Sequence, residues 1–242
     1  VAPLLYKNLL GADAVGMLPA ASLRRLEAAY HHSVSRNKRL RNELGIVLST
    51  LQEAGIEVIL LKGAALLPLL YDDIGVRPMG DLDIMVRIED VDRAEAALHR
   101  IGYRLSPLMP SFRPPEFQRQ YGGAAEYARE VDSGQIIMLD LHWQLTHSEW
   151  IRRTVRLDIT DLWETSRPWN SYGYRARILS SLYNLCHLTL HLLKHKFGPG
   201  HLRRLADVDR LLRVYAQELD TWETIALAKK ARIAIALYTV LQ

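Results

Sequence analysis

The sequence predicts an α+β fold, in which a small mixed or antiparallel sheet with its helices is flanked by helical regions at both ends. Two observations predict it. Apolar runs of strand length alternate with helical patterns over residues 56–148, and helical spacing dominates residues 1–55 and 149–242. A chain of 242 residues with 49% hydrophobic content can bury a substantial core, as one domain or as two closely packed lobes.

The first region, residues 1–55, is expected to be mainly helical. Apolar residues recur at helical spacing in its second half: Leu40, Leu44, Val47, Leu48 and Leu51. Gly55 follows the last of them, and a glycine just after an apolar helical pattern marks the end of a helix.

The central region, residues 56–148, opens with an apolar run from Val58 that we expect to form a buried strand. The run ends at Lys62 and Gly63 and continues into a helical pattern. A glycine at such a junction lets a phosphate approach the backbone, and the helix N-terminus offers free N–H groups. Lys62 adds a full positive charge, although a Lys-Gly pair alone is a weak signal.

The segment from Arg77 to Val86 sets Asp81 and Asp83 two residues apart in an apolar run. In a strand they would share one face, roughly 6 to 7 Å apart. Two carboxylates at that spacing repel each other unless a cation neutralises them, and oxygen ligands suit Mg²⁺. The alternative interpretation is a solvated strand end that carries two surface acids.

A third acid, Asp140, lies in the apolar run Gln135–Trp143, which we expect to form a hairpin with residues 124–130. An unpaired carboxylate there would cost several kcal/mol. A metal shared with the other two acids would compensate it, and a salt-bridged core aspartate is the alternative. His142, two residues on, lies on the same strand face.

Further elements are expected on either side of this hairpin. A helix is expected over Glu89–Ile101 and a proline-rich loop over Ser106–Pro115. In the third region, residues 149–242, the sequence predicts a loop over Pro168–Gly173, a helix over Leu179–Phe197 and a break at Gly198–Gly200.

The predicted helix Leu179–Phe197 carries His187, His191 and His195 every four residues, with Lys194 beside them. A zinc site is disfavoured, because no glutamate follows the first histidine and no cysteine accompanies the three. We expect the stripe to face a catalytic cleft, where Lys194 and a neighbouring histidine hold phosphate oxygens. A solvated helix face is the alternative. Asp207 is expected to orient one of these basic groups.

The charge distribution favours an anionic small-molecule partner. Basic residues crowd two helical regions: Arg24, Arg25, Arg36, Lys38, Arg39, Arg41, Arg203, Arg204, Arg210 and Arg213. A basic surface around an acidic metal site suits a nucleoside triphosphate. Nucleic acid is disfavoured but not excluded, because such binders more often interleave stacking aromatics, and Phe occurs three times.

The single cysteine and the absence of long apolar runs bear on the cellular compartment of the protein. The single cysteine, Cys186, lies among leucines and is expected to be a buried hydrophobe in a reducing, cytoplasmic environment. No apolar run approaches the roughly 18 residues of a membrane span, and no signal peptide is evident. Both termini look like cuts, so we expect a longer parent protein in which the C-terminal helical region continues.

The order of these motifs resembles the uncharacterised nucleotidyltransferase branch of the DNA polymerase β-like superfamily. The resemblance covers most of the chain and rests on segments in matching order and spacing: Pro3–Tyr6, Leu61–Gly63, Arg77–Val86, Asp140–Trp143 and His187–Asp207. One departure from the wider superfamily stands out. Lys62-Gly63 replaces the usual Gly-Ser pair before the first helix.

The resemblance implies the fold, a polymerase β-like core, and a mechanism. Asp81, Asp83 and Asp140 would hold two Mg²⁺ (or Mn²⁺) ions about 3.5 to 4 Å apart, and Asp140 would accept the proton of an acceptor hydroxyl. Lys62 and Arg77 would neutralise the triphosphate. Remaining nucleotide-binding residues in this interpretation are Gly63, His142, His191 and Lys194. A nucleoside monophosphate would pass from a nucleoside triphosphate to an acceptor that the sequence does not identify: a small molecule, a peptide, a protein or an RNA end.

Two alternatives remain open. A glycosyltransferase also uses Asp-x-Asp to bind a metal and a sugar nucleotide, but it would need neither Lys62-Gly63 nor the distant Asp140. A catalytically silent module of the same fold could serve as a binding part of a larger assembly, although the three acids are intact.

Overall fold

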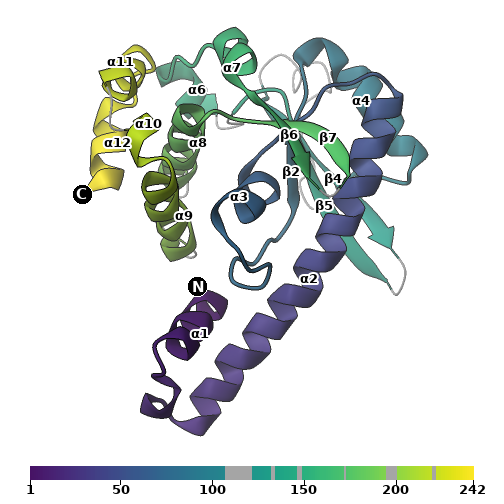
Figure 1. Cartoon of the computed structure of the whole chain (residues 1–242). Coiled ribbons are helices and arrows are strands. Elements are labelled where there is room, and N and C mark those ends of the chain that lie inside the picture. The colour runs from purple at the N-terminus through teal and green to yellow at the C-terminus, as the bar shows by residue number, and fades with distance from the viewer. Residues whose placement is uncertain (107–121, 132–133, 146–148, 172, 195–200, 220–221) are drawn as a thin grey trace.

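The computed structural model describes seven stretches of the chain: residues 1–106, 122–131, 134–145, 149–171, 173–194, 201–219 and 222–242. Within them, a mixed sheet forms the centre of the molecule and helices lie on both sides of it (Figure 1). The expected α+β class is confirmed.

The sheet has seven strands in the described part of the chain, in the order β3-β4-β5-β2-β1-β7-β6. The strands are β1 Ile59–Leu60, β2 Leu82–Met85, β3 Arg104–Leu105, β4 Ala124–Val131, β5 Gln135–His142, β6 Arg167–Ser171 and β7 Tyr174–Ile178. The pairs β2–β5 and β1–β7 are parallel, and the other four are antiparallel. The two parallel pairs bring together segments far apart in the sequence.

The hairpin β6–β7 corrects the sequence prediction. A loop was expected over Pro168–Gly173, within a region expected to be helical, but residues 167–171 form β6 and pair with β7. Proline disfavours a central strand because it lacks an N–H, and β6 is an edge strand, where that loss is tolerated. The third region therefore contributes two strands, and the sheet is larger than predicted.

Helices account for most of the remaining described residues. They are α1 Ala2–Gly11, α2 Ala20–Glu53, α3 Lys62–Leu70, α4 Val91–Arg100, α6 Glu149–Thr154, α7 Ile159–Thr165, α8 Ser181–Lys194, α9 His201–Val214, α10 Ala216–Leu219, α11 Trp222–Lys230 and α12 Ala234–Leu241, with short 3-10 turns at Val15–Met17 and Ile88–Asp90. Figure 1 shows α2 running along one side of the sheet and α8 to α12 gathered on the other side of the molecule.

Several predicted elements are confirmed. Helix α2 ends before Gly55, which has the left-handed φ of 67° that favours glycine. Helix α4 falls within the expected Glu89–Ile101, and β4 and β5 form the expected hairpin. The loop beyond Ser106, the tip of the hairpin and the Gly198–Gly200 break lie outside the described residues.

The strands alternate between two apolar layers, as period-two patterning requires. Leu60, Ile84 and Leu141 join the main core with α2, whereas Ile59 and Met85 join a smaller cluster with Leu162, Trp163, Leu179 and Tyr183. Burying each such side chain contributes about 1.5–3 kcal/mol. Because Asp83 alternates with Leu82 and Ile84, its side chain lies on the face away from the main core.

The predicted burial of Cys186 is confirmed, since its side chain is 1% exposed. Among the residues that the structure describes, no helix combines the length and apolarity that crossing a membrane would require.

Candidate active site

The parallel pairing of β2 with β5 brings two of the candidate acids together. Asp83 and Asp140 are direct register partners in this pair. One ligand atom from each, together with one from His142, lies within 4.8 Å of the others. The sequence correctly puts His142 on the same strand face as Asp140. Asp81 lies just before β2, which begins at Leu82, and is half-buried rather than part of the strand.

Asp83 is the most heavily contacted of these acids and is 2% exposed. Its Oδ1 accepts a short hydrogen bond from the Lys62 ammonium and lies 3.1 Å from Nε2 of His142. The same Nε2 lies 4.0 Å from Oδ2 of Asp140. Strand β1 holds Lys62 there, because the N–H of Leu61 donates to the Asp83 carbonyl at 3.0 Å.

Burial, repulsion between the acids and the contacts with Lys62 and His142 set the pKa values of the three acids. Burial would raise the pKa of Asp83, but the charge of Lys62 and the hydrogen bond from His142 outweigh it and hold that pKa well below its usual range. Burial and then the Asp83 charge raise the pKa of Asp140 to about 8. The same two causes raise the pKa of Asp81. One paired carboxylate therefore sits beside two that resist ionisation.

Such a site fits a divalent cation. Carboxylate oxygens are the ligands of Mg²⁺, and Mn²⁺ also accepts an imidazole nitrogen such as that of His142. A bound cation would stabilise the ionised forms of Asp81 and Asp140, whose pKa values are raised without it.

Arg77 is held in a buried ion pair. Its Nε and Nη2 each donate to the Asp207 carboxylate at 2.7 Å, and the Tyr71 hydroxyl donates to the same carboxylate at 2.7 Å. Asp207 was expected to orient a basic group of the histidine stripe, and it instead orients Arg77. The physical reason is access, because α9 packs against α3 and Asp207 is fully buried there.

Gly63 has a packing role beside this ion pair. A Cβ at this position would lie 2.8 Å from Nη1 of Arg77 and 2.9 Å from Cγ of Met79, closer than real contacts allow. The glycine therefore lets the buried guanidinium lie against the start of α3. Its expected contact with phosphate stays a prediction.

Asn37 is a site residue that the sequence reasoning missed. This fully buried side chain donates to the carbonyls of Ile74 and Arg77 at 2.6 and 2.8 Å, and accepts from the N–H of Met79 at 3.0 Å. It thereby holds the loop that leads into the first acid. A polar residue on the apolar face of the predicted helix, one turn before Leu40, was the available signal.

Two arginines hold the same loop from opposite sides. Arg36 of α2 donates to the carbonyls of Met79 and Gly80 at 2.8 and 2.6 Å. Arg203 of α9 donates to the carbonyl of Pro78 at 3.1 Å. The backbone just before the acids is thus fixed by both helical regions.

In its described part, the histidine stripe of α8 lies beside Lys62 and His142, and its expected role in a catalytic cleft stays a prediction. His187, His191 and Lys194 line one small hollow together with Lys62 and His142. Burial lowers the pKa of His187 to about 3, so this side chain is neutral. Burial and then the Lys62 charge lower the pKa of Lys194. His195 lies outside the described residues.

Three solved structures resemble the chain in outline. A nucleotidyltransferase-like antigenic protein from Paracoccidioides brasiliensis matches with a TM-score of 0.49 and 15% identity, over 82% of this chain and 92% of its own. The adenylyltransferase ANT(2″)-Ia, solved with adenylyl-2″-tobramycin, matches with a TM-score of 0.48 and 14% identity, over 83% and 98%. The lincosamide adenylyltransferase LnuA, solved with lincomycin, matches with a TM-score of 0.43 and 15% identity, over 72% and 96%. Likeness at this level carries no inference about substrates.

No curated protein matches this sequence significantly. The family model of the uncharacterised nucleotidyltransferases, in contrast, matches residues 1–242, and the chain belongs to this family.

Proposed function

We propose that the protein is a metal-dependent nucleotidyltransferase that moves a nucleoside monophosphate from a nucleoside triphosphate to an acceptor hydroxyl. The observation that carries the proposal is the register pairing of Asp83 with Asp140, beside Lys62. Family membership supports the reaction class.

Each charged group has a role in this proposal. Asp81, Asp83 and Asp140 would hold Mg²⁺ or Mn²⁺, which supplies Lewis-acid stabilisation of the triphosphate. Asp140, held in its ionised form by the cation, would accept the proton of the acceptor hydroxyl. Lys62 and Lys194 neutralise charge that develops on the triphosphate.

Further residues complete the proposed nucleotide site. His142 and His191 line the same hollow as Lys62 and Lys194, and Gly63 follows Lys62 at the start of α3. Arg77 contributes positive charge at the start of α3, although its bidentate pairing with Asp207 favours a positioning role. The free, buried Cys186 supports the expected cytoplasmic location. For the acceptor, we propose a small molecule, a peptide or a protein.

Thermal unfolding with Mg²⁺ or Mn²⁺ and each nucleoside triphosphate tests the proposal. A ligand that binds only the folded state stabilises it by mass action and so raises the melting temperature. At a ligand concentration a hundredfold above Kd, the free energy of unfolding rises by about 2.7 kcal/mol. Asp140→Asn should abolish the rise, because it removes one ligand without breaking the Lys62–Asp83 pair. Asp72→Asn, at an exposed site, is the matched control.

Asp83→Asn is expected to change the stability of the fold as well as ligand binding. It would leave Lys62, whose side chain is 15% exposed, without its partner. We therefore expect it to lower stability as well as to abolish ligand binding. If the ligand raises the melting temperature of Asp140→Asn as much as that of the wild type, Asp140 is not part of the binding site. Transfer of label from α-labelled triphosphates to metabolite and protein pools would then test the reaction class.

A further inference from the structure

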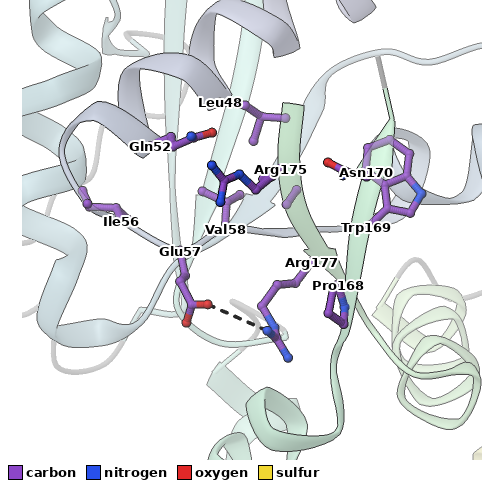
Figure 2. A pocket seen from close by; sticks show the side chains of 12 residues that line it. Leu48, Gln52, Ile56, Glu57, Val58, Pro168, Trp169, Asn170, Arg175 and Arg177 are labelled. Carbon is purple, nitrogen blue, oxygen red and sulfur yellow. Dashed lines mark ion pairs between the residues drawn. The ribbon is translucent and has the colours of Figure 1, made fainter. Parts of the chain in front are cut away.

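A second pocket, of about 460 Å³, lies away from the acids, between the end of α2 and the β6–β7 hairpin (Figure 2). Its volume falls within the roughly 300–1,000 Å³ of small-molecule sites. The lining residues come from α2, the segment before β1 and both hairpin strands: Leu48, Gln52, Gly55, Ile56, Glu57, Val58, Pro168, Trp169, Asn170, Arg175, Ala176 and Arg177.

This pocket is separate from the candidate active site. It opens at the N-terminal end of β1, near Val58, whereas Lys62 follows the C-terminal end of that strand. The four positions from Val58 to Lys62 correspond to about 13 Å of extended chain. No residue assigned to the metal or the nucleotide lines the pocket, so the proposed transfer reaction does not account for it.

The pocket carries one positive charge in excess. Arg177 is engaged, because its Nε and Nη2 donate to the hydroxyl and carbonyl of Ser166 at 2.6 and 2.7 Å and its Nη1 lies 3.8 Å from Glu57. Arg175 is exposed, and its side chain makes no hydrogen bond or ion pair within the described stretches. Figure 2 shows its side chain directed from β7 toward Gln52.

Neutral groups around Arg175 provide the rest of a binding surface. Asn170 is its register partner across the hairpin, and Gln52 brings a second exposed amide from α2. Apolar surface comes from Leu48, Val58 and the half-buried indole of Trp169. A pocket lined by a guanidinium, two amides and apolar surface suits a ligand with an anionic end and a flat apolar body.

We propose that this pocket binds a small aromatic molecule that carries a carboxylate or a phosphate. Arg175 pairs with the anionic group, and the amides of Gln52 and Asn170 donate to its remaining oxygens. The aromatic body lies against Trp169 and the aliphatic floor. The site is a binding site in addition to the transferase centre.

Calorimetric titration with naphthalene-1-carboxylate, 1-naphthyl phosphate and neutral 1-naphthol tests this proposal and separates the two anions. Either anion should bind the wild type at least about tenfold more tightly than naphthol, the range of a charge-assisted contact. Arg175→Gln should remove that preference, and Trp169→Leu should weaken all three probes. Arg39→Gln, an exposed arginine of α2, is the matched control and should bind as the wild type does.

Two further measurements fix the location. Asp140→Asn should bind the preferred anion unchanged, and Mg²⁺ with ATP should not displace it, so failure of the transferase proposal leaves this result intact. Absence of saturable binding by both anions, or equal affinities in Arg175→Gln and Arg39→Gln, would overturn the proposal. Displacement by ATP would instead assign the binding to the nucleotide site and overturn it as well.

Discussion

Lys62 adopts a φ of 41°, in the left-handed region that a residue with a side chain seldom occupies. Such a conformation costs about 1–3 kcal/mol and persists where surrounding structure fixes it. Here the pairing with Asp83 and the start of α3 both fix it. The left-handed backbone and the ion pair with Asp83 on β2 thus occur together where β1 gives way to α3.

Asp140 gives a pH-dependent prediction for the metal-free protein. Its pKa is about 8 in the fold and 3.8 in an unperturbed aspartate, so between these pH values the folded state holds a proton that the unfolded state has lost. This carboxyl therefore destabilises the fold increasingly as pH rises from about 4 to 8. In a chelating buffer, Asp140→Asn should gain stability over wild type across that window. Denaturant titrations at several pH values measure it, and a pH-independent difference would contradict it.

Lys194 gives a prediction about affinity. If its ammonium contacts the triphosphate, Lys194→Ala should weaken binding by roughly 1 to 3 kcal/mol, the range of a charge-assisted contact, with little change in melting temperature. Lys38→Ala removes an equal charge from an exposed position on α2 and serves as the control. Isothermal titration measures the affinity of both variants for the triphosphate. Equal affinities would mean that Lys194 does not contact the triphosphate and that the stripe is an ordinary helix face.

At the level of elements, the loop between α3 and β2 depends on helices from both ends of the chain. Helix α2 supplies Arg36 and Asn37, and α9 supplies Arg203 and Asp207. The sequence places the acids at the end of this loop, but it shows none of these contacts. Each joins positions at least 37 residues apart, where local patterns carry no information.

Asp207 supplies the test at this scale. Asp207→Asn leaves the Arg77 guanidinium, 6% exposed, without a compensating charge, and breaking a buried pair costs about 3–5 kcal/mol. Asp209→Asn breaks an exposed pair with Arg213, for which we expect about 0–1 kcal/mol. Chemical denaturation of both variants measures the difference. Similar losses would mean that the loop does not depend on this ion pair.

For the whole molecule, the sequence predicted the fold class and the strands that are apolar and contiguous. It missed β6 and β7, because Pro168 and the adjacent turn residues are typical of loops, and only the edge position in the sheet makes a strand possible. Among site residues, the spacing rule placed Asp140 and His142 on one face. It could not place Asp83 opposite Asp140, since strand order is a property of the assembled sheet.

Hydrogen exchange would report the stability of the central strands. The N–H of Leu61 bonded to Asp83 and that of Val86 bonded to His142 lie inside the sheet, so they should exchange among the slowest in the chain. Exposed amides near the ends of α11 and α12 should exchange fastest. Addition of Mg²⁺ and a triphosphate should slow the central amides further. Unchanged central protection at saturating ligand would contradict binding of the ligand to the folded state.

The parallel pairing of β2 with β5 also matters for protein synthesis. Asp83 and His142 are 59 positions apart in the chain. Strand β1 pairs with β2 and with β7, and β7 is synthesised much later than β1. A chain that leaves the ribosome from its N-terminus therefore presents its first two acids long before the third can meet them. Under the proposed function, a nascent chain cannot assemble the metal and nucleotide site until β5 lies beside β2. Every incomplete chain that ends before this strand would then lack the proposed activity.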